Sequence, residues 1–263
     1  VAINPGAAAY CVSDYRRSVV FIRGVYAAIG ELRSRFPDST LQILYAGCGP
    51  YATLILPLLS KFLPGDITVH LLDAHQASLD NVKLLLTHFG FLGHDVEIIK
   101  ADACNYRHHL QPHLIIAETM QKALEQEPQF AVTANLAPQL RDAGIFIPQQ
   151  VDVSLCLADL ERGRELNSLT VPSNKCEATP DAWKYPLASV AALCPETAFA
   201  QMQRAQAQVE HTELHLNSTI VTIPQRSDLH ALEAALFTRI SVFGHHHLDD
   251  YECQITLPSK CYE

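Results

Sequence analysis

Several features that would identify the class of a protein by themselves are missing from this chain of 263 residues. No apolar run approaches the roughly 18 to 20 residues that a membrane-spanning helix needs, and the N-terminus does not have the arrangement of a signal peptide. The sequence has no GxxxxGK(S/T) phosphate-binding loop, no internal repeat and no low-complexity tract. We therefore expect a cytoplasmic globular protein that does not bind a membrane.

The eight cysteines lack any spacing that would give them a shared role. They lie far apart, with no CxxC pair and no His/Cys spacing of a zinc finger, so reduced thiols are the simplest interpretation. Three consecutive histidines, His245 to His247, stand beside two aspartates. Consecutive residues of a strand point to opposite faces, so the three cannot all face one ion. We expect a polar hairpin turn after Gly244 and predict no metal site.

Positive charge is scarce, most of all toward the C-terminus. The chain carries 19 lysines and arginines against 28 acidic residues, and residues 151–263 carry eight basic and fifteen acidic side chains. Such a surface repels polyphosphates, which argues against nucleic-acid binding, and it favours an amine-bearing or otherwise cationic small-molecule substrate. Because 48% of the residues are hydrophobic, the chain can bury a full core, which argues against disorder.

The first 150 residues alternate between strand-like and helical patterns. From Asp14 to Arg35, apolar residues recur with a period close to 3.6, which predicts an amphipathic helix. Strands are predicted at 43–46, 67–74, 96–102, 114–118 and 145–148, and helical segments between them at 53–63, 76–89 and about 128–141. This alternation predicts βαβ units and a parallel sheet, with ligands beyond the carboxyl ends of the strands.

The pattern changes after residue 150. Segments 151–160, 212–223, 236–244 and 252–257 are strand-like with polar alternation, and one helix is predicted from Glu196 to Gln208. This half of the chain therefore predicts a second, mainly antiparallel layer.

A glycine-rich turn follows the first predicted strand, in LQILYAGCGP at residues 41–50. Gly47 and Gly49, on either side of Cys48, allow the backbone to turn sharply and a ligand to approach closely. GCGPYA fits the dinucleotide fingerprint GxGxxA and also a shorter GxG turn. Such a turn is typical of proteins that bind an adenosine-containing cofactor, although a tight turn without a ligand is the alternative.

The next two predicted strands end in acidic residues. The second ends in Asp73-Ala74, where a carboxylate can accept hydrogen bonds from both ribose hydroxyls; alternatively, Asp73 caps the helix that begins near Gln76. The third ends in Asp102-Ala103, placed to reach an adenine amino group. An NAD enzyme needs no acid at the third strand end. The order of glycine turn, acid and acid resembles the class I S-adenosylmethionine (SAM) methyltransferases.

The fourth predicted strand leads into the most specific motif of the chain. It ends in Ala117-Glu118-Thr119-Met120, and a second carboxylate, Glu127, lies nine residues after Glu118. This pattern resembles the double-glutamate loop of the protein arginine methyltransferases. The resemblance implies that Glu118, Met120 and Glu127 hold the acceptor, and that either glutamate can serve as a general base. Surface charge or helix capping is the alternative, since Glu125 adds another acid to the segment.

The resemblance to this family extends to the predicted N-terminal helix. In that family, a helix with the motif DxxR(S/T)xxY covers the cofactor. The residues here that resemble this motif are Asp14, Arg17, Ser18 and Phe21. This implies that Arg17 binds the methionyl carboxylate; a solvated helix face is the alternative. The match covers residues 14–150 well. In the remainder of the chain, only the β-rich pattern is similar. In two departures, Tyr45 stands where an acid is common and Tyr51 replaces the last glycine of GxGxG.

The resemblance implies an α/β fold with a Rossmann-like class I methyltransferase sheet, N-terminal helices and a C-terminal β-rich domain. Residues 1–40 would cover the cofactor, 41–150 would bind SAM, and 151–263 would bind substrate or form a homodimer. The expected acceptor is an amine, a guanidine or another small polar metabolite. The residues expected to bind SAM are Arg17, Gly47, Cys48, Gly49, Asp73, Ala74, Asp102, Ala103 and Glu118.

Other functions fit parts of the same pattern. Tyr45 and Tyr51 suit an enzyme that breaks a different sulfonium bond of SAM, by cyclisation or aminocarboxypropyl transfer, and releases methylthioadenosine. They equally suit a non-catalytic scaffold of this fold, whereas an NAD-dependent oxidoreductase is supported only by GxGxxA. The single tryptophan, Trp183, either packs over a cationic sulfonium or anchors its loop on the core, and we expect the second.

Overall fold

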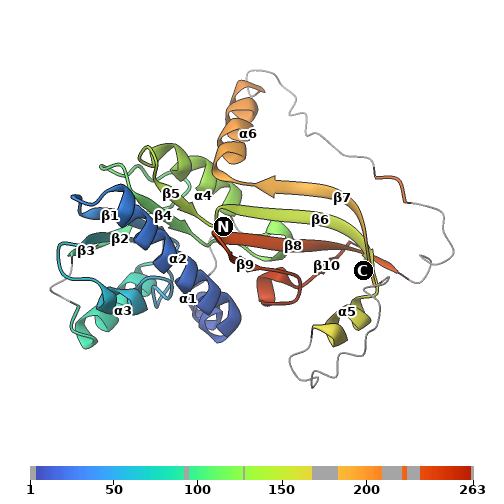
Figure 1. The fold of residues 1–263 in the computed structure, drawn as a ribbon, viewed down its shortest axis with the longest axis horizontal. Coiled ribbons are helices and arrows are strands. Elements are labelled where there is room, and N and C mark those ends of the chain that lie inside the picture. Colours follow the sequence, from blue (N-terminus) through green and yellow to red (C-terminus); the bar gives the residue numbers. More distant parts are fainter. Residues whose placement is uncertain are drawn as a thin grey trace.

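The computed structural model describes residues 4–91, 95–126, 128–167, 183–208, 221–223 and 232–261. The molecule is built around two sheets: in Figure 1 a sheet covered by helices lies on the left, and a second sheet extends from it to the right. The chain begins with α1 (Pro5–Tyr10), a short 3₁₀ helix η1 (Cys11–Ser13) and the long helix α2 (Tyr15–Arg35). The helix predicted from Asp14 to Arg35 is confirmed, with Asp14 as its N-cap.

The first sheet is parallel and has the strand order β3-β2-β1-β4-β5. Every pairing in it is parallel, as the alternation of strands and helical segments predicted. The predicted Rossmann-like sheet is therefore confirmed. Its strands are β1 (Leu41–Ala46), β2 (Ile67–Asp73), β3 (Asp95–Lys100), β4 (Leu114–Ala117) and β5 (Ile145–Ile147), and its helices are α3 (Gln76–His88) and α4 (Gln129–Leu136), the latter continued by η5 (Ala137–Gln139).

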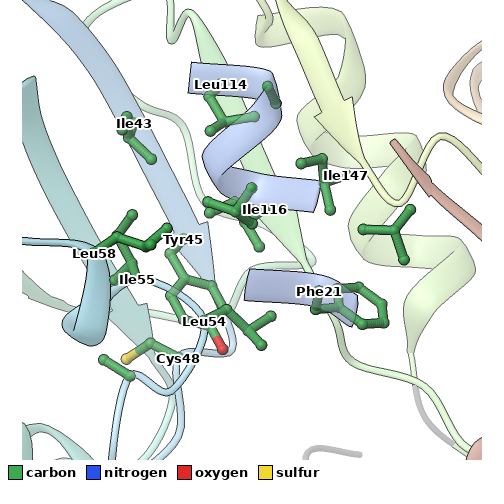
Figure 2. Close-up of a cluster of buried hydrophobic side chains, with 14 of the residues drawn as sticks. Phe21, Ile43, Tyr45, Cys48, Leu54, Ile55, Leu58, Leu114, Ile116 and Ile147 are labelled. Atoms are coloured by element: carbon green, nitrogen blue, oxygen red, sulfur yellow. The ribbon is translucent and has the colours of Figure 1, made fainter. Parts of the chain in front are cut away.

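Alternate residues of the central strand β1 pack against different layers, because successive side chains of a strand point to opposite faces. Ile43 and Tyr45 belong to the buried cluster that contains Phe21 of α2, and Figure 2 shows these side chains together. Leu44 and Ala46 belong to a second cluster that contains residues of α4. Burial on both faces explains why β1 reads as a nearly continuous apolar run.

The second sheet is antiparallel, with the order β10-β8-β6-β7 and with β9 paired to β8. The predicted β-rich half of the chain is thus confirmed. Trp183 packs there against Phe237 and Tyr251, so it anchors its segment on this sheet as expected. The strands are β6 (Gln150–Ala158), β7 (Lys184–Leu193), β8 (Glu233–Phe243), β9 (His246–Leu248) and β10 (Ser259–Lys260), and the helices are α5 (Leu160–Leu166) and α6 (Pro195–Gln208).

Two sequence predictions are wrong in detail. Segment 53–63, predicted as a helix, contains only the 3₁₀ helix η2 (Leu56–Lys61), because Pro57 has no N–H to donate and Ala52 takes a left-handed φ of 45°. Segment 252–257, predicted as a strand, forms bends around the 3₁₀ helix η7 (Gln254–Thr256).

The strand β7 and the helix α5 were not predicted. Of the segment predicted as a strand at 212–223, residues 212–220 lie outside the described part of the chain, and residues 221–223 form no strand. Among the described helices, none is both long enough and apolar enough to cross a membrane.

Helix α2 packs closely against the second sheet at Gly24. A Cβ atom at this position would lie 2.5 Å from Cγ1 of Val242, a fully buried residue of β8. At Gly30 of the same helix, a Cβ atom would meet nothing within 4 Å. The first glycine is therefore required by packing, whereas the second is not.

We expect Gly24→Ala to lower the free energy of unfolding by about 1 to 3 kcal/mol, because the added methyl group displaces Val242. The matched variant Gly30→Ala should raise it by about 0.5 to 1 kcal/mol, since alanine loses less backbone entropy than glycine in a helix. Urea denaturation of both variants measures the difference, and equal shifts would contradict the packing between α2 and β8.

Candidate active site

One pocket gathers every predicted site residue that the structure describes. It lies at the carboxyl ends of β1, β2, β3 and β4, and Ala8 of α1 and Cys11 of η1 also contribute to it. Glu127 lies outside the described residues. The predicted residues that line the pocket are Arg17, Gly47, Cys48, Gly49, Asp73, Ala74, Asp102, Ala103, Glu118 and Met120.

The glycine turn is built as the sequence predicted, with Gly47 and Gly49 at left-handed φ values of 70° and 61°. The N–H groups of Gly47 and Cys48 both donate to the carbonyl oxygen of Leu72, at 2.8 and 3.1 Å. A Cβ atom at Gly47 would lie 2.4 Å from Cγ2 of Thr119. The turn is thus fixed on one side by β2 and packed on the other against the residue after Glu118.

The Asp73 carboxylate closes this turn. Its Oδ2 accepts the N–H of Gly49 at 2.9 Å, and its Oδ1 accepts the N–H of His75 at 2.8 Å. The N-cap residue of α3 is His75, so Asp73 does not cap the helix. An ionised carboxylate has about four lone-pair positions, and these two bonds leave acceptor capacity for a ligand.

The next strand end places Asp102 at the surface of the same pocket. Its carboxylate accepts the N–H of Cys104 at 2.9 Å and the side-chain amide of Asn105 at 3.5 Å. Burial and the nearby Asp102 charge raise the pKa of Cys104 to about 11, so this thiol stays protonated at neutral pH. Ala103 beside it is buried.

A buried ion pair lines the pocket. Nη2 of Arg17 lies 3.5 Å from Oε2 of Glu118, and the two side chains are only 9% and 8% exposed. Burial alone would lower the pKa of Arg17, but the surrounding groups, Glu118 first, raise it above its ordinary value. Nε of Arg17 is buried without a hydrogen-bond partner. Burial rules out the alternative that Arg17 is on a solvated helix face.

Tyr45 lies on the same face of the sheet as this ion pair. It is paired with Ile116 of β4, two residues before Glu118, and its side chain is buried. Burial first, and then the Glu118 charge, raise the pKa of Tyr45 well above its ordinary value. Tyr45 therefore stays neutral where an acid would place a second negative charge beside Glu118.

The loop after Glu118 is tied to the second sheet. Two of its residues that are not glycine, Ala123 and Leu124 of η4 (Lys122–Leu124), take left-handed φ values of 55° and 59°. The N–H of Ala123 donates to the buried Thr238 hydroxyl at 2.9 Å, and the Ser259 hydroxyl donates to Glu125 at 2.5 Å. These bonds hold a backbone conformation that would otherwise be unfavourable.

Two other candidates lie elsewhere. Trp183 lines a separate pocket of the second sheet, together with Phe237 and Lys184. The expected hairpin turn after Gly244 joins β8 to β9; His245 lies in this turn, whereas His246 and His247 belong to β9, and His247 pairs with Asp249 at 3.2 Å. Among the residues that the structure describes, no group of three histidine, cysteine or acidic side chains is arranged to hold a metal ion.

The sequence prediction missed Cys11, Thr119 and Gln129. Cys11 lines the pocket from the short helix before α2, Thr119 packs on Gly47, and Gln129 binds the backbone on both sides of Glu118. The signal in the sequence is their closeness to motif residues: Cys11 lies three residues before Asp14, Thr119 follows Glu118, and Gln129 lies two residues after Glu127. Their contacts depend on segments that come together only in the fold.

No protein-family model matches the sequence, and no curated protein matches it either. Solved structures do match. Arabidopsis thaliana protein arginine methyltransferase 10 has a TM-score of 0.60 and 14% identity, over 96% of this chain and 83% of that chain. A chain of the Trypanosoma brucei PRMT1 enzyme-prozyme heterotetrameric complex with AdoHcy has a TM-score of 0.57 and 13% identity, over 98% and 84%. The fold is that of the protein arginine methyltransferases.

Replacing Arg17 by methionine removes the positive charge that faces Glu118 in the pocket. We expect Arg17→Met to lower the free energy of unfolding at pH 7 by about 3 to 5 kcal/mol, the usual cost of breaking a buried ion pair. The double variant Arg17→Met/Glu118→Gln should recover part of this loss, because it removes both charges. Urea denaturation measures all three proteins.

The matched control is the neighbouring residue. Arg16 is 54% exposed and pairs with Glu252 at 2.6 Å, so Arg16→Met should cost no more than about 1 kcal/mol. Equal losses for Arg16→Met and Arg17→Met would contradict a stabilising buried pair.

Proposed function

We propose that this protein transfers a methyl group from SAM to an amine, a guanidine or another small polar acceptor. The observation that carries the proposal is the buried Arg17–Glu118 pair beside the glycine turn, because one pocket then offers a cation for a ligand carboxylate and an anion for a cationic acceptor. The similar T. brucei structure contains AdoHcy, the demethylated form of SAM, which supports the same ligand class here.

The proposal assigns a pocket residue to each part of SAM. Arg17, whose buried Nε has no partner, would bind the methionyl carboxylate. The glycine turn, formed by Gly47, Cys48 and Gly49, would lie against the methionyl chain. The Asp73 carboxylate, next to Ala74, would hold the ribose through its remaining lone pairs. Asp102 and Ala103, at the end of β3, would contact the adenine.

Glu118 would orient the acceptor and take its proton. SAM would supply the methyl group, whose bond to a positively charged sulfur breaks when the acceptor nitrogen attacks the methyl carbon. A buried carboxylate holds a cationic group strongly because little water screens the interaction. Met120, two residues after Glu118, is buried. Glu127 would supply a second carboxylate for the acceptor. The neutral Tyr45 leaves Glu118 as the charged acceptor of hydrogen bonds on this face of the sheet.

The excess of acidic residues in the chain, 28 against 19 basic ones, favours an acceptor that carries a positive charge. A small polar metabolite is the acceptor class that we propose. A homodimer stays a prediction; the T. brucei neighbour is part of a heterotetrameric complex.

The test combines binding with product analysis. Calorimetric titration with SAM should show binding, and incubation with a panel of amines and guanidines should yield S-adenosylhomocysteine that depends on the acceptor. Methylthioadenosine formed without an acceptor would mean that SAM itself is the substrate and that a different sulfonium bond breaks. Absence of SAM binding would contradict the proposal and favour a non-catalytic scaffold.

Asp73→Ala should weaken binding of S-adenosylhomocysteine by about 1 to 3 kcal/mol, because the ribose hydroxyls lose their acceptor. The measurement is calorimetry, with Asp80→Ala as control. Asp80 lies on α3 and accepts a hydrogen bond from Gln76, away from the pocket lining. Unchanged affinity in Asp73→Ala would show that the carboxylate serves only the glycine turn.

Glu118→Gln should abolish turnover while S-adenosylhomocysteine still binds, since the acceptor loses its carboxylate and the methyl donor keeps its other contacts. Glu125→Gln is the control, because Glu125 lies in the same loop but outside the pocket lining. Turnover is followed as S-adenosylhomocysteine release. Near-normal turnover in Glu118→Gln would remove this residue from the mechanism.

A further inference from the structure

The carboxamide of Gln129 holds the backbone on both sides of Glu118. Gln129 is the first residue of α4 and is only 1% exposed. Its Nε2 donates to the carbonyl oxygen of Ala117 at 2.8 Å. Its Oε1 accepts the N–H of Thr119 at 2.8 Å and the Thr119 hydroxyl at 2.9 Å. Glu118 is thus the residue between two backbone groups that one side chain fixes.

This pair of bonds takes the place of a neighbouring strand. In a parallel sheet, one residue donates to the carbonyl oxygen of residue i on the adjacent strand and accepts the N–H of residue i+2. The Gln129 carboxamide makes the same two bonds, to Ala117 and Thr119. The last pairing between β4 and β5 is Ile116 with Ile147, so the carboxamide extends the hydrogen bonding beyond the end of the ladder.

Thr119 transmits this restraint to the glycine turn. Its hydroxyl is fixed by Gln129, and its methyl group occupies the space that a Cβ atom at Gly47 would need, 2.4 Å away. The end of β4 and the turn after β1 therefore have one relative position. This position sets the separation between Glu118 and the part of the pocket formed by Gly47 and Gly49.

We propose that Gln129 is a positioning residue, which holds the Glu118 carboxylate at the place where it orients the acceptor. The proposal rests on the proposed methyl transfer. Gln129 itself does not line the pocket, whereas its neighbours Pro128 and Val132 do, so it acts through the backbone of residues 117–119. Among the described residues, Gln129 has no hydrogen bond to Arg17 or Asp73. The glycine turn keeps its own bonds to Leu72 and Asp73, so we expect these predicted SAM contacts to remain when Gln129 is replaced.

The first variant is Gln129→Met, which keeps a similar length and volume and loses the hydrogen bonds. We expect kcat to fall by about 100-fold, the cost of a small misplacement of a reacting group, with the acceptor that the amine and guanidine panel identifies. The Kd for S-adenosylhomocysteine, measured by calorimetry, should change little. A residue that only stabilises the fold would weaken both together.

Thr133→Val is the matched control. The Thr133 hydroxyl makes the longest contact of the same carboxamide, at 3.4 Å, and the other three contacts survive its removal. We expect kcat to stay close to that of the unsubstituted protein.

A second variant, Gln129→Glu, tests the hydrogen-bond pattern through pH. A protonated carboxyl group can donate to Ala117 and accept from Thr119 as the carboxamide does, whereas the carboxylate can only accept. The ratio of kcat in this variant to kcat in the unsubstituted protein should therefore rise as the pH falls. Loss of packing alone would give a ratio that does not depend on pH.

The outcomes separate the two proposals. Absence of turnover in the unsubstituted protein overturns the proposed function, and the assignment of Gln129 with it. If the unsubstituted protein is active, normal kcat in Gln129→Met overturns the assignment of Gln129 alone. If Gln129→Met does not fold, a ratio that stays constant with pH in Gln129→Glu does the same.

Discussion

The buried contact between Arg17 and Glu118 joins the N-terminal helix α2 to the end of the central strand β4. Burying two charges costs several kcal/mol each unless they compensate one another, so this contact is stable only while both side chains keep their place. Asp14 fixes the helix end from which Arg17 projects, because it accepts the N–H of Arg17 and also that of Gln254 near the C-terminus. The position of α2 and the charge balance of the pocket therefore depend on each other.

The parallel sheet explains why the pocket forms at this edge. The carboxyl ends of β1, β2, β3 and β4 meet there, and each brings polar groups to the pocket: the glycine turn, Asp73, Asp102 and Glu118. Asp73 and Gln129 then fix two of these ends with side-chain bonds to backbone N–H groups. The second sheet contributes differently, by holding the loop after Glu118 through Thr238 and Ser259.

Residue patterns predicted the elements that have strong periodicity or a continuous apolar run, such as α2 and the strands of the parallel sheet. They failed where a proline or an unusual backbone conformation interrupts an otherwise helical pattern, and where pairing with another strand overrides a weak local preference. Segment 53–63 has a helical pattern but contains Pro57 and follows the left-handed Ala52, and β7 has a weak alternation that its pairing with β6 stabilises. Motif residues could be chosen from strand ends, whereas the bonds of Gln129 and the burial of Arg17 depend on segments distant in the sequence.

The most direct measurement is a crystal structure of the protein with S-adenosylhomocysteine. It should show the ligand carboxylate against Arg17, the ribose hydroxyls on Asp73 and the adenine beside Asp102 and Ala103. The Glu118 carboxylate should then face the space next to the ligand sulfur. A nucleoside bound outside this pocket, or one whose carboxylate points away from Arg17, would contradict the assignment of the site.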